Sequence, residues 1–244
     1  MKKYSLITGA SSGIGRQIAI QLSKQNNILI MESKIFELGK TKKLCSKSSK
    51  ILIFKYDFKD IKNLENNFES FIKKNNIQID NFVHCAGIAE VKPFRLFSLS
   101  DIQNTININF LSAAVISQSL TKIVNKNKPK NILFISSLAS EMGVNGHSFY
   151  CASKGALDSL MKSLAIELSP ETRVNSILPG TIQTEMNKNI FKNKNLKKKI
   201  KKGYLLGPGK INYIVDYVMF ILSDKAKWIT GQKIIIDGGK SSHG

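Results

Sequence analysis

The chain has 244 residues and a formal net charge of +20 at pH 7, from 37 Lys and Arg against 17 Asp and Glu. This length suits one well-buried core, and no apolar run reaches the roughly 18 residues that a membrane-spanning helix needs. Three cysteines without a CxxC pair and three scattered histidines indicate neither a disulfide framework nor a metal site. We therefore expect a single domain over residues 1–244, cytoplasmic, without a metal and without a membrane partner.

The positive charge is compatible with a polyanionic partner, but its distribution favours a simpler cause. The lysines are mostly dispersed through a chain that is also rich in Asn and Ile, as AT-rich codons would produce, and no aromatic residues interleave with them. We expect no nucleic-acid partner. One cluster stands apart and contains Lys192, Lys194, Lys197, Lys198, Lys199, Lys201 and Lys202.

Seven short apolar runs rich in β-formers alternate with segments of helical spacing. The runs cover residues 4–8, 28–31, 51–56, 79–85, 131–136, 173–178 and 233–236. Strands that are apolar nearly throughout are typical of a parallel sheet covered on both faces. The pattern predicts an α/β protein, a single-domain doubly wound (Rossmann) fold with a seven-stranded parallel sheet flanked by helices.

A glycine-rich turn follows the first predicted strand and opens the first helix. Gly9, Gly13 and Gly15 have the spacing Gly-x-x-x-Gly-x-Gly. Glycines at this place allow a tight turn and let a pyrophosphate approach the N–H groups at the start of a helix. The turn predicts dinucleotide binding, although a purely structural turn would also use glycine.

A tyrosine and a lysine lie four residues apart at the start of a long helical run, residues 153–168. Tyr150 and Lys154 would then share one helix face, one turn apart. A free tyrosine loses its proton only near pH ~10, and a neighbouring ammonium lowers that pKa and suits the phenol for acid–base catalysis. Such a pair alone is common on helix surfaces, so its meaning depends on the other motifs.

The motifs occur together in one order: Gly9 to Gly15, Ala86-Gly87, Asn109, Ser136-Ser137, Tyr150 with Lys154, and Pro179-Gly180. In this order and spacing the chain resembles the short-chain dehydrogenase/reductase family over nearly its whole length, and is similar to its β-ketoacyl-carrier-protein reductases. The resemblance implies nicotinamide-dependent exchange between a carbonyl and an alcohol.

The resemblance also implies roles for four residues. Tyr150 corresponds to the acid–base residue, and Lys154 to the residue that lowers its pKa and binds the nicotinamide ribose. Ser137 corresponds to the hydroxyl that polarises the carbonyl, and Asn109 to the asparagine that holds a water supplying protons to the lysine. The implied cofactor contacts are Gly9, Ser11, Ser12, Gly13, Ile14, Gly15, Ser33, Lys34, Asp57, Phe58, Cys85, Ala86, Gly87, Tyr150, Lys154, Pro179, Gly180, Ile182 and Thr184.

The chain departs from the family where Asn-Asn-Ala-Gly is common, because it has His84-Cys85-Ala86-Gly87. We interpret His84 as a core histidine of the fourth strand and not as a catalytic base. The backbone of Ala86 and Gly87 would still pass close to the cofactor, while the local hydrogen-bond network must differ.

The choice of cofactor depends on the end of the second strand. Counted without gaps from Gly9, the discriminating position is Ser33, followed by Lys34, which favours NADP(H). NAD(H) is the alternative, because one deletion near residues 26–27 would bring Glu32 to the acidic position that contacts the ribose.

The predicted substrate is a 3-oxoacyl-type carbonyl, with a possible acidic carrier protein as partner, or a sugar or polysaccharide-precursor carbonyl. Pocket candidates are apolar, and a lid is expected over residues 184–204; the candidates are Val91, Phe94, Met142, Val144, Phe149, Met186, Ile190 and Phe191. The resemblance implies a homotetramer or homodimer contacting through residues 104–124 and 153–168. The alternative function is a non-catalytic nucleotide-sensing or polyanion-binding protein, against which the complete set of four site residues argues.

Overall fold

The computed structural model describes residues 2–193, 195, 198, 200 and 202–242. Its strands are β1 Lys2–Thr8, β2 Asn27–Glu32, β3 Ile51–Lys55, β4 Ile77–His84, β5 Asn131–Ile135, β6 Arg173–Pro179 and β7 Lys233–Ile236. Its helices include α1 Gly13–Leu22, α2 Ile35–Leu44, α3 Leu64–Asn75, α4 Leu99–Ile106, α5 Ser112–Thr121, α6 Ser148–Glu167, α7 Lys188–Lys192 and α9 Ile211–Ile221.

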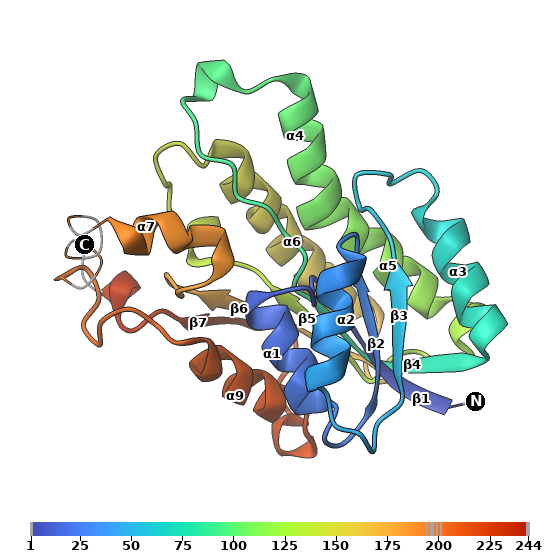
Figure 1. The fold of residues 1–244 in the computed structure, drawn as a ribbon. Helices are drawn as coiled ribbons and strands as arrows, with labels where there is room; N and C mark the ends of the chain where they lie inside the picture. The colour runs from blue at the N-terminus through green and yellow to red at the C-terminus, as the bar shows by residue number, and fades with distance from the viewer. Residues whose placement is uncertain (1, 194, 196–197, 199, 201, 243–244) are drawn as a thin grey trace.

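All seven strands pair in parallel, in the order β3-β2-β1-β4-β5-β6-β7. The sheet lies between two helical layers, with α1, α2 and α9 on one face and α3, α4, α5 and α6 on the other (Figure 1). This is the doubly wound fold with a seven-stranded parallel sheet that the sequence predicts. The strand order reverses between β1 and β4, so their carboxyl ends border the crevice where ligands of such folds bind.

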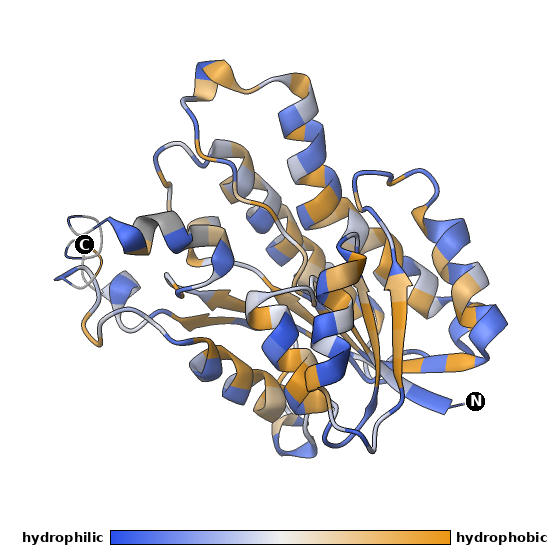
Figure 2. Ribbon diagram, viewed as in Figure 1, coloured by the Kyte–Doolittle hydropathy of each residue, from blue (hydrophilic) through white to orange (hydrophobic). Residues whose placement is uncertain are grey.

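Alternation along each strand divides the core between the two layers. Leu6 and Leu29 face the layer of α3, α5 and α6, whereas Ile7, Ile28 and Ile30 face the layer of α1 and α9. The strands are accordingly hydrophobic over much of their length, with hydrophilic residues at the amino-terminal end of β1, and hydrophilic residues lie mostly on the outward faces of the helices (Figure 2). The continuous apolar runs of the sequence are explained by this burial on both faces.

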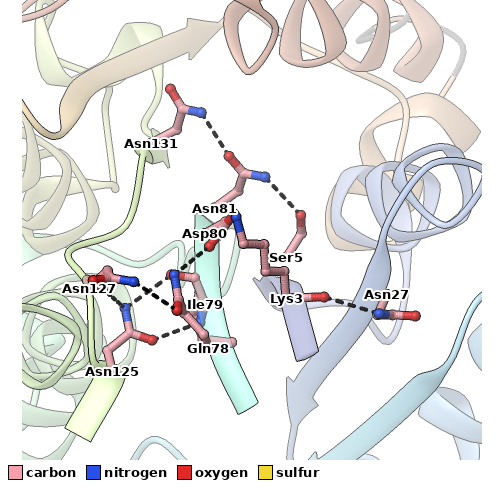
Figure 3. A network of polar contacts seen from close by, with 10 residues as sticks. All are labelled: Lys3, Ser5, Asn27, Gln78, Ile79, Asp80, Asn81, Asn125, Asn127 and Asn131. Carbon is pink, nitrogen blue, oxygen red and sulfur yellow. Dashed lines mark hydrogen bonds and ion pairs between the residues drawn. The ribbon is translucent and has the colours of Figure 1, made fainter. Parts of the chain in front are cut away.

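A network of amides closes the amino-terminal edge of the sheet (Figure 3). The fully buried Asn125 accepts a hydrogen bond from the Ile79 N–H at 2.7 Å and donates to the Ile79 carbonyl at 3.0 Å. Asn131 donates to Asn81 at 2.7 Å, and Asn81 donates to Ser5 at 3.0 Å. These bonds satisfy polar groups where β1, β4 and β5 begin, and they leave the opposite edge free for a site.

Within the described part of the chain, no helix is both long and apolar enough to cross a membrane.

Candidate active site

The glycine turn brings the ends of β1 and β4 into backbone contact. Gly9 has a φ of +66°, and a Cβ at this position would lie 2.6 Å from the Ala86 nitrogen. A Cβ on Gly15 would lie 2.4 Å from the Gly9 carbonyl oxygen. A side chain at either position would therefore collide with backbone, and only glycine permits the approach.

The first turn of α1 offers free amides next to this contact. Ser12 is the N-cap, and its side chain makes no capping hydrogen bond. The N–H groups that follow it are thus available to an anion, and no acidic side chain in the first turn opposes one. Gly13 has a φ of +54°, and its missing Cβ faces Thr184 at 3.6 Å. A pyrophosphate fits this turn, between α1 and the segment that follows β6.

The other expected cofactor contacts lie along the same carboxyl edge of the sheet, with differing exposure. Asp57 is exposed just beyond β3, whereas the side chain of Phe58 is buried in the core, so Phe58 could meet a cofactor only through its backbone. Cys85 and Gly87 follow β4, and burial raises the pKa of the Cys85 thiol to about 12, which keeps it neutral. The remaining contacts expected here are Ser11, Ile14, Ala86, Pro179, Gly180 and Ile182.

Glu32, at the end of β2, points to the face of the sheet that α1 covers. Glu32 is the last residue of the strand and shares the parity of Ile28 and Ile30, whose side chains face α1. Its carboxylate accepts hydrogen bonds from the Ser33 N–H at 2.9 Å and the Ser33 hydroxyl at 3.2 Å. Lys34 is exposed at the N-cap of α2. Glu32 therefore lies on the face of the sheet that α1 covers, whereas Lys34 lies at the start of α2.

Three expected catalytic side chains converge beyond β5. Ser137 caps a short 3-10 turn, where its Oγ accepts from the Ala139 N–H at 3.1 Å, and it lies near enough to Tyr150, in the first turn of α6, to lower the pKa of that phenol. Lys154 is buried one turn later, with Nζ 5.9 Å from the centroid of the Tyr150 ring and donating to the Ile135 carbonyl at 2.8 Å. The pair of residues therefore meets as the helical spacing predicts.

Burial sets the protonation of both groups. It raises the pKa of Tyr150, although the Ser137 hydrogen bond acts in the opposite direction. It lowers the pKa of Lys154 to about 8, while electrostatic interactions with Cys85 and Asp158 act to raise it. Tyr150 consequently keeps its proton at neutral pH, and Lys154 titrates near pH 8.

Asn109 lies in a π-helical turn between α4 and α5 and is completely buried. Its side chain accepts from the Ile88 N–H at 2.8 Å and donates to the Ile88 carbonyl and to the Ser153 hydroxyl, both at 2.9 Å. A Cβ on Gly87 would lie 3.5 Å from both the Asn109 Oδ1 and the Lys154 Nζ. The Asn109 amide and the Lys154 ammonium therefore lie on either side of the position that a Gly87 side chain would occupy.

Thr8 provides a hydrogen-bond partner for His84, the residue at which the chain departs from the family pattern. The Thr8 Oγ1 accepts from the N–H groups of Cys85 and Ala86 at 3.2 and 3.3 Å, so its proton points to the His84 Nδ1, 2.9 Å away. Burial lowers the pKa of His84 to about 3, which keeps the ring neutral. Sequence reasoning did not identify Thr8, although it ends a strand directly before the glycine turn.

The segment after β6 is held by a tyrosine from the far end of the expected lid. The Tyr204 hydroxyl donates to the Thr181 Oγ1 at 2.7 Å and accepts from the Thr181 N–H at 2.9 Å. A Cβ on Gly180 would lie 2.9 Å from the Tyr204 ring. Sequence reasoning missed this anchor, since Tyr204 is distant in the chain and carries no local motif.

Aromatic side chains cluster where the loop after β4 meets the start of α6. Phe149, just before Tyr150, stacks on Phe94 with ring centroids 5.6 Å apart and meets Phe97 edge-on at 5.0 Å. Lys92 joins the two loops, because its N–H donates to the Gly146 carbonyl at 3.1 Å. Further exposed apolar side chains expected at the pocket are Val91, Met142, Val144 and Met186, whereas Phe191 is buried.

The lysine cluster falls largely outside the described residues, which include Lys192, Lys198 and Lys202 but not Lys194, Lys197, Lys199 or Lys201. The side chain of the pocket candidate Ile190 also lies outside the description.

Comparison with known proteins shows the family to which the chain belongs. A family model described as enoyl-(acyl carrier protein) reductase matches residues 9–241. The chain is 34% identical to the 3-oxoacyl-[acyl-carrier-protein] reductase of Buchnera aphidicola subsp. Baizongia pistaciae, over 98% of this chain and 97% of that protein. It is also 34% identical to the L-rhamnose 1-dehydrogenase (NADP(+)) of Thermoplasma acidophilum, over 97% and 95% of the two chains.

Among solved structures, a 4-hydroxyisoleucine dehydrogenase complexed with NADH superposes with a TM-score of 0.91 at 28% identity, covering 100% of both chains. A glucose/ribitol dehydrogenase from Brucella melitensis superposes with a TM-score of 0.86 at 29% identity, over 98% of this chain and 96% of that one. The chain belongs to the short-chain dehydrogenase/reductase family and is an oxidoreductase of that family.

Proposed function

We propose that the protein reduces a carbonyl to a secondary alcohol, or catalyses the reverse reaction, with a nicotinamide dinucleotide. The observation that carries this proposal is the convergence of Ser137, Tyr150 and the buried Lys154 beyond β5, with the Lys154 Nζ 5.9 Å from the centroid of the Tyr150 ring. Two hydroxyls that meet at the open edge of the sheet can both bond one carbonyl oxygen, and a neighbouring buried cation favours the negative charge that develops there.

The residues present fit a dinucleotide. The uncapped start of α1 and the Gly9, Gly13 and Gly15 turn would hold the pyrophosphate, and the nicotinamide ribose would bind beside Lys154. When bound, the cofactor supplies or accepts the hydride. A Cβ at these glycine positions would occupy the space beside the turn, so the pyrophosphate site can form only in a chain that has glycine there.

The chain's own residues would handle the proton and the orientation. Ser137 fixes the carbonyl oxygen, and Tyr150 donates its proton to that oxygen as the alcohol forms. Lys154 stabilises the phenolate that remains. Asn109, whose amide lies across the position of a Gly87 side chain from Lys154, would hold a water through which Lys154 exchanges protons with solvent.

We infer that NAD(H) is the preferred cofactor, the alternative that the sequence left open. Glu32 ends β2 on the side of the sheet that faces α1, where a carboxylate accepts hydrogen bonds from ribose hydroxyls and repels a 2′-phosphate. NADP(H) binding would instead require Lys34 to reach the phosphate from its exposed position at the start of α2.

We propose a 3-oxoacyl substrate class, because Phe94, Phe149 and Val91 are apolar and suit an aliphatic body. An acidic carrier protein bearing the acyl group would be attracted by the chain's positive charge. We propose a homotetramer or homodimer that forms through residues 104–124 and 153–168. Ile166 on α6 is 81% exposed and suits such a contact. Static light scattering would measure the oligomeric state.

The test is a panel of carbonyl compounds followed by absorbance of the reduced nicotinamide at 340 nm. The panel contains one 3-oxoacyl group as a carrier-protein thioester and as a pantetheine thioester, together with pentuloses and keto-aldonic acids. The proposal expects turnover of both thioesters, and a steep fall of kcat/KM with added salt for the carrier-bound form alone. Turnover of the sugars alone would assign the substrate to the polyol class. Dinucleotide binding without turnover of any carbonyl would favour the nucleotide-sensing alternative.

A further inference from the structure

A carboxylate that sequence reasoning did not single out lies under the candidate catalytic residues. Asp158 is on α6, one turn after Lys154 and two turns after Tyr150, and is 4% exposed. The same helix face buries Leu157 and Met161. An acidic residue on such a face is unfavourable unless a charge or hydrogen bonds compensate it.

Hydroxyl groups from three elements surround this carboxylate. Ser140, Ser136 and Ser176 lower the pKa of Asp158, whereas burial, the larger influence, raises it. Yet among the described residues neither carboxylate oxygen has a partner at regular hydrogen-bond geometry, and the Ser176 hydroxyl has none either. The Ser140 hydroxyl donates instead to the Ser137 carbonyl at 2.8 Å. Asp158 is therefore not fully used as a structural acceptor.

The groups around Lys154 indicate that the Asp158 carboxylate acts electrostatically on this lysine. Four other titratable or charged groups face or act on Lys154: Asp158 and Tyr150 on its own helix, and His84 and Cys85 at the end of β4. Burial keeps His84 neutral, with a pKa of about 3, and keeps Cys85 neutral, with a pKa of about 12. The pKa of Tyr150 is raised as well. Cys85 also acts to raise the pKa of Lys154, but its thiol carries no charge near pH 8, so Asp158 is the group among these four that supplies negative charge to the buried ammonium.

We propose that Asp158 is a positioning residue that holds Lys154 in its charged form and through it tunes proton exchange at Tyr150. The role in turnover rests on the proposed function, but the effect on Lys154 does not. Asp158 acts on Lys154 across one helical turn and would touch neither substrate nor cofactor. The hydrogen bond from Ser140 to Ser137 connects the hydroxyls around Asp158 with the turn that would bind the carbonyl.

The direction of the effect follows from the charges. Removing the carboxylate removes an attraction that raises the pKa of Lys154, so this pKa should fall below its value of about 8. For two charges one helical turn apart in a partly shielded interior, the fall is about one pH unit. At neutral pH less Lys154 is then protonated, the Tyr150 phenolate is less stabilised, and the pKa of Tyr150 rises.

The decisive test is the titration of Lys154 in the full chain without substrate. The protein is labelled at lysine Cε with ¹³C, the signal that titrates near pH 8 is assigned by its absence in Lys154→Met, and the titration is repeated in Asp158→Asn. Asp216→Asn removes the same charge from an exposed position on α9 and serves as the control. We expect Asp158→Asn to lower the pKa by about one pH unit and the control to leave it unchanged. An unchanged pKa in Asp158→Asn would overturn the proposal.

Two further measurements separate positioning from a purely structural role. In the direction of alcohol oxidation, the acidic limb of the kcat/KM profile should move to higher pH in Asp158→Asn, with about a tenfold loss of rate on that limb and little change at high pH. Asp158→Leu, which removes an uncompensated buried carboxylate, should fold with equal or higher thermal stability and give the same lowered pKa. Loss of stability in both variants with an unchanged Lys154 pKa would assign Asp158 a structural role. If no carbonyl is turned over, the proposed function fails and the NMR titration alone decides the role of Asp158.

Discussion

Gly9→Ala would force a methyl group into the contact between the ends of β1 and β4. The new Cβ would lie 2.6 Å from the Ala86 nitrogen and 2.7 Å from the Cys85 carbonyl carbon, and both are backbone atoms that cannot rotate away. The φ of +66° adds about 1–2 kcal/mol for a residue with a side chain. Overpacking of this kind adds about 1–3 kcal/mol. The free energy of unfolding should therefore fall by roughly 2–5 kcal/mol.

In a domain of this size that loss corresponds to a melting temperature lower by about 5–15 °C. Dinucleotide affinity should fall at least about tenfold as well, because the distorted turn leads into the first turn of α1, whose amides would bind the pyrophosphate. Differential scanning fluorimetry with and without dinucleotide, and isothermal titration calorimetry, measure the two effects.

Gly39→Ala is the matched control. Gly39 lies within α2, and a Cβ there would meet no atom within 4 Å. Alanine should stabilise the helix by about 0.5–1 kcal/mol and leave dinucleotide binding unchanged. Equal melting temperatures for the two variants, or a Gly9→Ala protein that binds dinucleotide as wild type does, would refute the account of this turn.

Three other predictions concern the cofactor, the buried lysine and the amide network. Glu32→Ser should weaken NADH binding about tenfold and improve NADPH binding, as calorimetry would measure; wild-type preference for NADPH would instead assign the contact to Ser33 and Lys34. Because the folded-state pKa of Lys154 is lowered to about 8, the unfolded chain binds more protons between pH 8 and 10.5 and wild-type stability rises across that window. The stability advantage of Lys154→Met, measured by urea unfolding, should shrink by up to about 3 kcal/mol over the same range, and a constant advantage would contradict the depressed pKa. Asn125→Ala should cost about 3 kcal/mol of unfolding free energy by leaving the Ile79 backbone groups unpaired, and a loss below about 1 kcal/mol would show that water replaces the amide.

The fold was predictable because its determinants are local. Continuous apolar runs identify strands that are buried on both faces, and the glycines of the first turn identify a backbone approach that no other residue permits. The actual β4 starts earlier than the predicted strand, at Ile77. Its polar residues Gln78 and Asp80 belong to the edge network of Figure 3, a tertiary feature that a search for apolar runs does not detect.

The site was predictable where chemistry follows helical spacing, as for Tyr150 and Lys154. It was not predictable where a contact depends on distant elements. The anchor from Tyr204 to Thr181 joins two ends of an irregular segment, and Asp158 gains its meaning only when the helix face that it shares with Lys154 is seen to be buried. Glu32 and Ser33 could not be separated without the register of β2, because one residue reverses the face to which a strand side chain points.

The central claim is hydride transfer to a carbonyl with Tyr150 as the proton donor. The most direct measurement incubates the protein with a 3-oxoacyl thioester and a reduced dinucleotide deuterated at nicotinamide C4, and analyses the alcohol by mass spectrometry. The account predicts one deuterium at the new carbinol carbon, and a rate at least about 100-fold lower in Tyr150→Phe with nearly unchanged dinucleotide affinity. An alcohol without deuterium, or a Tyr150→Phe protein within a few-fold of the wild-type rate, would contradict it.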